Sequence, residues 1–370
     1  MTESTKSGTS GVSSSSTASR PLDDYNFTFE SVLDDSSHIE ADSNPHDIYD
    51  TQSLSESIAD FREEFGRTYH SYRAGSYYFP NDPTEAERMD EQYEIIKVIM
   101  DGRLHLAPFT REKYPQKVLD IATGTGLWAI EMGDEYPDAS IVGTDLSPIQ
   151  PPFVPPNVRF FVEDSTEDWD YPPSEFDFIH TRVTIGCWAD MKKEIIARAF
   201  HHLKPGGWLE CQEVPGMPHC DDGTMPLDYD WLKWTLELYN SSRLANRQVD
   251  VGEQLKDWMR EVGFVDVHEA VFKIPLNGWP KDTRLKHVGM LWQRNLLDGL
   301  QGFSLGFFSK HLGKTQEEIE ISLVDVRRSL FNRKIHAYHK LYVVYGRKPE
   351  DAAAVATAPE AEGGGPEDEK

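Results

Sequence analysis

Cysteine is scarce in this chain of 370 residues, and Cys187, Cys211 and Cys220 form no close pair. Disulfide frameworks of small secreted domains and zinc sites both need characteristic cysteine spacings. This sequence has neither pattern, so we expect a reducing compartment, cytoplasmic or nuclear, and no bound metal.

Long apolar runs are missing as well. No stretch of 18 consecutive apolar residues occurs, which predicts that the chain has no membrane span. Residues 1–20 are rich in Ser and Thr and lack the apolar segment of a secretory signal. We expect no membrane partner.

Positive charge is in short supply, with 37 Lys and Arg against 63 Asp and Glu and a net charge of -26. Residues 1–60 hold 12 acidic and 2 basic residues, and residues 349–370 hold 7 acidic and 1 basic. This balance argues against direct nucleic-acid binding and against anionic membranes. Their polar composition predicts disordered tails over residues 1–57 and 349–370.

From residue 117 the pattern alternates between strand and helix, which predicts a doubly wound, Rossmann-like α/β sheet in a domain of residues 117–348. The expected strands are 117–122, 140–146, 157–164, 175–182, 207–214, 264–276 and 337–348. The expected helices are 127–137, 190–203, 228–241 and 250–262, with a helical insertion over 281–336. Residues 58–116 are predicted to be an N-terminal helical segment, with a short helix over 58–66 and another after Asn81-Asp82-Pro83.

The stretch VLDIATGTGLWAIEMG, residues 118–133, joins an apolar strand to a helix through a Gly-Thr-Gly turn. Glycine at 124 and 126 lets the backbone approach a ligand, and the following helix directs its free N–H groups to the same place. The turn by itself is a weak signal, because it also suits an NAD(P)-dependent oxidoreductase.

Three carboxylates sharpen this interpretation. Asp120, Asp145 and Asp164 end three successive strands, whose carboxyl ends meet at one edge of such a sheet. Asp145 follows Gly126 by 19 residues, where a carboxylate accepts hydrogen bonds from ribose hydroxyls. Asp164 is placed to meet an adenine amino group, and Asp120 to hold a cationic group or its water shell. A single Asp after a strand is more often a helix cap or turn residue.

Several segments together resemble the class I S-adenosylmethionine-dependent methyltransferases. These segments are VLDIATGTG, IVGTDLS, VEDSTEDW, FDFIHTR and HHLKPGGWLECQEV. The resemblance covers residues 61–348 and implies seven strands, with the last one antiparallel between strands five and six. It also implies S-adenosyl-L-methionine as cofactor. Asp120 and the KPGGW segment disfavour an oxidoreductase. Ala122 departs from the pattern, because many members carry glycine there.

A narrower resemblance is to the fungal LaeA-like methyltransferases. It rests on R-x-Y-H-x-Y-R-x-G-x-Y-Y-x-P-N-D from Arg67 to Asp82, on LHLAPF and on VGTDLSPIQP. That group implies a role in fungal secondary metabolism, either methylation of a metabolite or regulation through protein partners.

The resemblance also implies roles for individual residues. Gly124 and Gly126 would shape the cofactor turn, and Asp145 would bind ribose. Asp164 with Ser165 would meet adenine, and Asp120 would lie beneath the methionine part of the cofactor.

The catalytic base stays open. Some small-molecule O-methyltransferases carry a His after strand four, but here Gly186 stands at that place. His180 is more often a structural residue than a base, and His219 with Cys220 are weaker candidates for substrate contact.

Two aromatic segments also have open roles. Tyr69, Tyr72, Tyr77 and Tyr78 suit either a lid over the cofactor or ordinary packing. The insertion 281–336 suits either a cap over an apolar substrate or a surface for a protein partner.

Overall fold

The computed structural model of the chain describes residues 61–110 and 113–351. In these residues seven strands form one mixed sheet in the order β5-β4-β3-β6-β7-β9-β8. Its strands are β3 Lys117–Ile121, β4 Ser140–Asp145, β5 Val158–Val162, β6 Phe176–Arg182, β7 Leu203–Glu213, β8 Val265–Pro275 and β9 Tyr338–Arg347. Strands β3 to β7 run parallel, whereas β9 pairs antiparallel with both β7 and β8. This confirms the predicted Rossmann-like sheet with its last strand inserted antiparallel.

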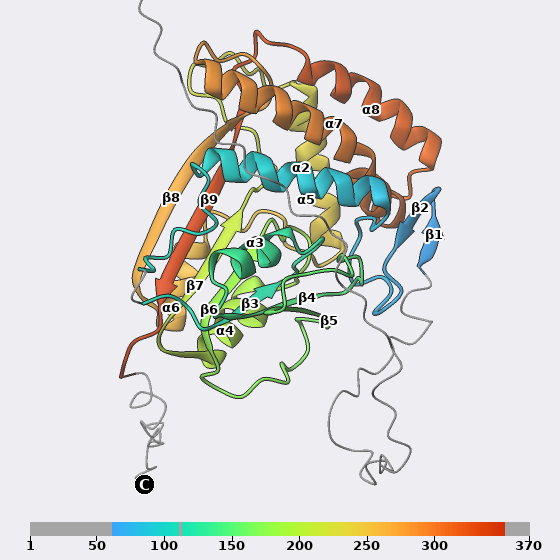
Figure 1. Cartoon of the computed structure of the whole chain (residues 1–370). Coiled ribbons are helices and arrows are strands. Elements are labelled where there is room, and N and C mark those ends of the chain that lie inside the picture. The colour runs from blue at the N-terminus through green and yellow to red at the C-terminus, as the bar shows by residue number, and fades with distance from the viewer. Residues whose placement is uncertain (1–60, 111–112, 352–370) are drawn as a thin grey trace, which may run out of the picture. The chain divides into compact units, whose positions relative to one another are not determined.

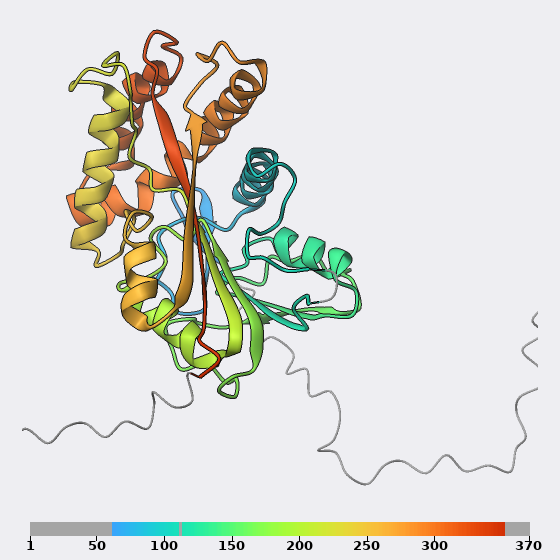
Figure 2. The same cartoon turned by 90° about the vertical axis from the view of Figure 1, so that its left-hand side faces the viewer.

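Helices cover both faces of this sheet. They are α2 Pro83–Ile99, α3 Leu127–Glu135, η1 Lys192–Ile196, α4 Ala197–His202, α5 Asp230–Leu244, α6 Leu255–Val262, α7 Thr283–Leu312 and α8 Gln316–Leu330. Seen nearly edge-on, the sheet has α2 and α3 on one side and α5 and α6 on the other (Figure 2). The long α7 and α8 form the expected helical insertion between β8 and β9.

Alternation along β3 decides which side chains face which layer. Leu119 and Ile121 pack in a cluster with residues of η1, α4 and α6. Val118 packs on the opposite side with residues of α3 and with Phe178 of β6. Because successive strand residues point to opposite faces, Asp120 lies on the same face as Val118, toward α3.

Helix α2 begins where the sequence predicts. Asp82 is its N-cap, and the carboxylate accepts a hydrogen bond of 3.0 Å from the backbone N–H of Glu85. The helix lies alongside α7 (Figure 1) and also contacts α3. It therefore links the glycine-turn side of the sheet to the helical insertion.

One local prediction was wrong. Instead of a helix over 58–66, β1 Arg62–Glu64 and β2 Arg67–Tyr69 form an antiparallel hairpin. Phe65 and Gly66 both have positive φ, 57° and 72°, which is the two-residue turn that matches strand twist. The predicted helix 190–203 is confirmed as η1 followed by α4, which ends at His202, whereas β7 begins at Leu203 and so starts four residues before the predicted strand 207–214.

The predicted tails 1–57 and 349–370 lie outside the described residues, apart from 349–351. Within the described part of the chain, no helix combines the length and the apolar run that crossing a bilayer requires.

Candidate functional site

A cavity lies at the carboxyl edge of the sheet, where β3, β4, β5 and β6 end. Residues of α2 and of the segment 70–81 line it from the other side. Five of the six predicted site residues line this cavity: Asp120, Gly124, Asp145, Asp164 and Ser165. Gly126 does not.

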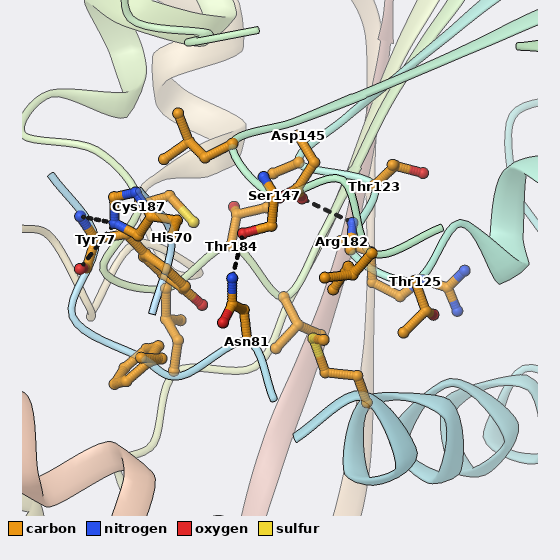
Figure 3. Close-up of a pocket in the computed structure, with 18 of the residues that line it drawn as sticks. His70, Tyr77, Asn81, Thr123, Thr125, Asp145, Ser147, Arg182, Thr184 and Cys187 are labelled. Carbon is orange, nitrogen blue, oxygen red and sulfur yellow. Dashed lines mark hydrogen bonds between the residues drawn. The ribbon is translucent and has the colours of Figure 1, made fainter. Parts of the chain in front are cut away.

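Asp145 ties the end of β4 to the glycine turn. One carboxylate oxygen accepts the backbone N–H of Gly124 and the other that of Ser147, both at 2.9 Å (Figure 3). Burial raises the pKa of Asp145 to about 6, although these two hydrogen bonds favour the ionised form. Each carboxylate oxygen has a second lone pair, so Asp145 can still accept hydrogen bonds from a ligand.

The two glycines of the turn serve different purposes. Gly124 has a φ of +61°, and a Cβ there would meet only the Sδ of Met89, at 3.6 Å. At Gly126, with a φ of +83°, a Cβ would lie 2.4 Å from Cζ of Phe160. Gly124 therefore borders the cavity, whereas Gly126 makes room for the ring of a neighbouring strand. Ala122, at a φ of 55°, occupies backbone space that favours glycine.

Both carboxylate oxygens of Asp120 contact protein groups. One oxygen lies 2.7 Å from Nδ1 of His180, and the other accepts the Thr123 hydroxyl at 2.5 Å. His180 is completely buried and stacks on Trp128 with ring centroids 3.7 Å apart. Burial lowers the pKa of His180 to about 4, so its ring is neutral at pH 7.

Asp120 therefore organises the turn, and the second lone pair of each carboxylate oxygen leaves it able to accept from a ligand as well. His180 is a buried, hydrogen-bonded residue, with Nδ1 donating to Asp120 and Nε2 left as an acceptor without a partner.

The two residues expected at the adenine end are held by local contacts. Oδ1 of Asp164 accepts the backbone N–H and the hydroxyl of Thr166, at 3.0 and 2.7 Å, and Oδ2 lies 3.7 Å from Nε of Arg73. Oγ of Ser165 accepts from Nε1 of Trp188 at 2.9 Å. Both side chains border the cavity, and Asp164 also shapes the turn after β5.

The remaining histidines and the cysteine considered from the sequence lie away from the cavity. His219 stacks on Tyr338, and Cys220 contacts Asp222; neither residue lines the cavity. His201 and His202 lie in the last turn of α4 and do not line it either.

Each of the two aromatic segments contributes only some of its residues to the cavity. Of the four tyrosines between residues 67 and 79, Tyr77 lines the cavity, and Tyr69, Tyr72 and Tyr78 do not. From the insertion, Phe303 reaches the cavity, whereas Trp292, Phe307 and Phe308 are buried core residues.

Sequence reasoning missed Arg182 at the end of β6. Its guanidinium lies 4.4 Å from the ring centroid of Tyr93, and its Nη2 is buried without a hydrogen-bond partner. Burial lowers the pKa of Arg182. The sequence pattern could have placed Arg182 beside the cavity, because it follows His180 by two residues and so shares the same face of the strand.

Asn81 was missed as well. Its Nδ2 donates to Oγ of Ser147 at 3.2 Å and connects the N-terminal segment to the residues after β4. Nothing in its local sequence pattern distinguishes this role from that of a turn residue before the helix.

Comparison with known proteins agrees with this geometry. A family model described as "Methyltransferase domain" matches residues 89–269. The chain is 40% identical to "Methyltransferase pytC" of Aspergillus terreus over 80% of this chain and 91% of that protein.

Two further relatives are described as regulator or protein methyltransferase. The chain is 35% identical to "Secondary metabolism regulator LAE1" of Cochliobolus heterostrophus, over 78% of this chain and 94% of that protein. It is 33% identical to "Protein-methionine methyltransferase laeA" of Emericella nidulans, over 78% of this chain and 77% of that protein.

Proposed function

Because the chain belongs to the class I S-adenosylmethionine-dependent methyltransferases, in their fungal LaeA-like group, we propose that it methylates a small apolar acceptor in fungal secondary metabolism. It is an enzyme that uses S-adenosyl-L-methionine as cofactor. The cofactor supplies an activated methyl group on its sulfonium. The identity of the acceptor and the roles of the residues around the cofactor form the proposal.

The residues at the carboxyl edge fit this cofactor. Gly124 leaves its Cβ direction open toward the cavity, and Asp145 keeps acceptor capacity for ribose hydroxyls. Asp164 and Ser165 stand at the end of β5, where adenine would lie, and Asp120 holds the turn beneath the methionine part. Gly126 contributes indirectly, by allowing Phe160 to pack under the turn.

The apolar lining of the cavity is the observation that carries the proposal for a small acceptor. Outside the residues assigned to the cofactor, the lining includes the apolar and aromatic side chains of Tyr77, Phe79, Ile185 and Phe303 together with the polar residues His70, Glu85, Arg88 and Arg247. Such a lining suits a compact, largely apolar molecule with a few polar groups. It would orient the acceptor and exclude water from the reacting atoms.

Three side chains of this lining that could act as a base are held by the backbone or by burial. Nδ1 of His70 lies 2.6 Å from the carbonyl oxygen of Tyr72, and Nε2 lies 3.2 Å from both the backbone nitrogen and the carbonyl oxygen of Tyr77. Burial raises the pKa of Tyr77 and of Cys187 well above their usual values. The geometry therefore favours an acceptor whose attacking atom is nucleophilic near neutral pH without a strong protein base.

The second candidate is a regulatory methyltransferase that acts through protein partners in the control of secondary metabolism or development. The descriptions of the relatives from Cochliobolus heterostrophus and Emericella nidulans favour it. The two candidates differ in where the methyl group goes, so one labelling experiment separates them.

The experiment uses the full chain and radiolabelled S-adenosyl-L-methionine with extract of the host fungus. Label in the organic-soluble fraction supports the small acceptor, and label confined to protein supports the regulatory candidate. Calorimetry with unlabelled cofactor is run first, because lack of binding would refute the cofactor assignment.

Phe303→Ala should raise the KM for the acceptor while leaving cofactor affinity unchanged, since Phe303 lies in the acceptor half of the cavity. The matched control is Phe331→Ala, because Phe331 is exposed after the end of α8. Equal effects of the two variants would contradict the placement of the acceptor.

A further inference from the structure

Arg182 is half-buried at the end of β6, and its Nη2 atom is fully buried. No carboxylate of the described residues forms an ion pair with it, and its Nη2 has no hydrogen-bond partner. Leaving a cation desolvated and unpaired is costly, unless an anion occupies the site in the working state. Arg182 lines the same cavity as Asp145 and Gly124.

The two carboxylates that interact electrostatically with Arg182, Asp120 and Glu210, accept hydrogen bonds from other groups. Asp120 accepts from His180 and Thr123, as described above. Glu210 accepts the backbone N–H groups of Leu106 and Ala107, at 2.8 and 2.7 Å, and the Gln212 amide at 2.7 Å. Both carboxylates attract the charge of Arg182, but neither forms an ion pair or a hydrogen bond with its guanidinium.

The position of Arg182 in the sheet relates it to the glycine turn. In the register of β3 and β6, Ile121 is opposite Thr181, so Arg182 follows directly where the chain from β3 enters the turn. Arg182 lines the same cavity as Thr123 and Thr125 of the turn (Figure 3). Phe303, which we assign to the acceptor, comes from a different element, α7.

The ring of Tyr93 fixes the direction of the charge. With its Cζ 4.4 Å from the ring centroid of Tyr93, the guanidinium makes a cation–π contact, and the N–H donors of its buried Nη2 are without a partner. A planar guanidinium presents paired N–H donors that match a carboxylate.

We propose that Arg182, positioned by Tyr93, binds the carboxylate of the amino-acid part of S-adenosyl-L-methionine. This inference rests on the cofactor site described under Proposed function. It gives β6 a direct part in cofactor recognition and assigns the unpaired charge to the end of the ligand opposite adenine.

Three ligands and one substitution test this assignment in the full chain. Calorimetry compares S-adenosyl-L-methionine with decarboxylated S-adenosylmethionine and with 5′-methylthioadenosine, which lacks the amino-acid part. Arg182→Gln should weaken binding of the first ligand by about tenfold to a hundredfold, the range for losing a charged hydrogen bond. It should change the affinity of the other two by less than about threefold, the upper range for a lost indirect contact.

Arg247→Gln is the matched control. Arg247 also lines the cavity, but its Nε donates to the carbonyl of Ser76 at 2.8 Å and its Nη1 to that of Asn246 at 3.0 Å. The Arg247→Gln variant therefore removes one positive charge from the same cavity, and it should change the affinities of the three ligands equally. Selective weakening of the carboxylate-bearing ligand by Arg247→Gln would show a general electrostatic effect and overturn the assignment.

Unchanged binding of S-adenosyl-L-methionine to Arg182→Gln would also overturn it, while leaving the proposed function intact. Failure of the unaltered protein to bind that cofactor would refute both. Binding of 5′-methylthioadenosine serves as the check that the variant is folded. If Arg182→Gln does not fold, Arg182→Lys decides, and it should weaken only the carboxylate-bearing ligand because it keeps the charge and loses the planar donors.

Discussion

Substituting Asp145 by alanine tests the central contact of the proposed cofactor site. The carboxylate accepts backbone N–H groups of Gly124 and Ser147 and would accept ribose hydroxyls through its remaining lone pairs. A hydrogen bond to a charged group contributes about 1.5–3 kcal/mol. Loss of two such bonds to ribose predicts a cofactor affinity lower by at least about a hundredfold.

The stability of the ligand-free protein should change much less. Burial raises the pKa of Asp145 from 3.8 to about 6, so the ionised group is disfavoured in the fold by about 3 kcal/mol at neutral pH. Alanine removes this cost but leaves two backbone N–H groups without their acceptor, at about 1–3 kcal/mol each. Because the two effects are of similar size and opposite sign, we expect unfolding free energies within about 2 kcal/mol of each other.

The same carboxylate predicts how binding depends on pH. Ribose recognition needs the ionised acceptor, so affinity in the unaltered protein should fall as the pH drops below about 6. Asp145→Asn keeps one acceptor oxygen and cannot titrate, so it should bind more weakly with a flatter pH profile. Calorimetry from pH 5 to 8 and urea unfolding of the same samples measure both effects. Near-normal affinity of Asp145→Ala together with a loss of stability would show that Asp145 is only a structural cap.

Three further predictions concern the turn, a buried acid and the tails. Gly126→Ala should lower the melting temperature because its Cβ meets Phe160, whereas Gly124→Ala should fold but bind the cofactor more weakly. Melting curves and calorimetry compare the two variants. A larger loss of stability in Gly124→Ala, with a larger loss of affinity in Gly126→Ala, would refute these separate roles. Burial raises the pKa of Glu213 from 4.5 to about 7, so this group makes the fold less stable as the pH rises from 4.5 to 7. Glu213→Gln should remove up to about 3 kcal/mol of that decline in urea unfolding, and an unchanged slope would contradict the assignment. A chain trimmed to residues 58–348 should match the full chain in cofactor affinity and melting temperature, and a large drop would show that a tail packs on the domain.

The fold class followed from the sequence because it depends on local periodicity. Central strands such as β3 and β6 are almost continuously buried and read as apolar runs, and the helices between them have their own period. The carboxyl-edge location of the site followed as well, since parallel strands bring their ends together regardless of detail. That is why Asp120, Asp145 and Asp164 could be grouped from spacing alone.

The hairpin of β1 and β2 could not be read in the same way. Its strands have three residues each, too few to show a period, and its turn depends on the positive φ of Phe65, a residue that rarely adopts it.

Only the tertiary structure decided what each site residue does. The sequence made Gly124 and Gly126 equivalent, but the ring of Phe160 from another strand separates them. It did not show that the two oxygens of Asp120 contact His180 and Thr123. Only the tertiary structure shows that Tyr93 of α2 lies against Arg182 and that no described carboxylate forms an ion pair with it. Local patterns encode which strand and which face a residue occupies, whereas hydrogen-bond partners and burial arise between segments far apart in the chain, which no local pattern contains.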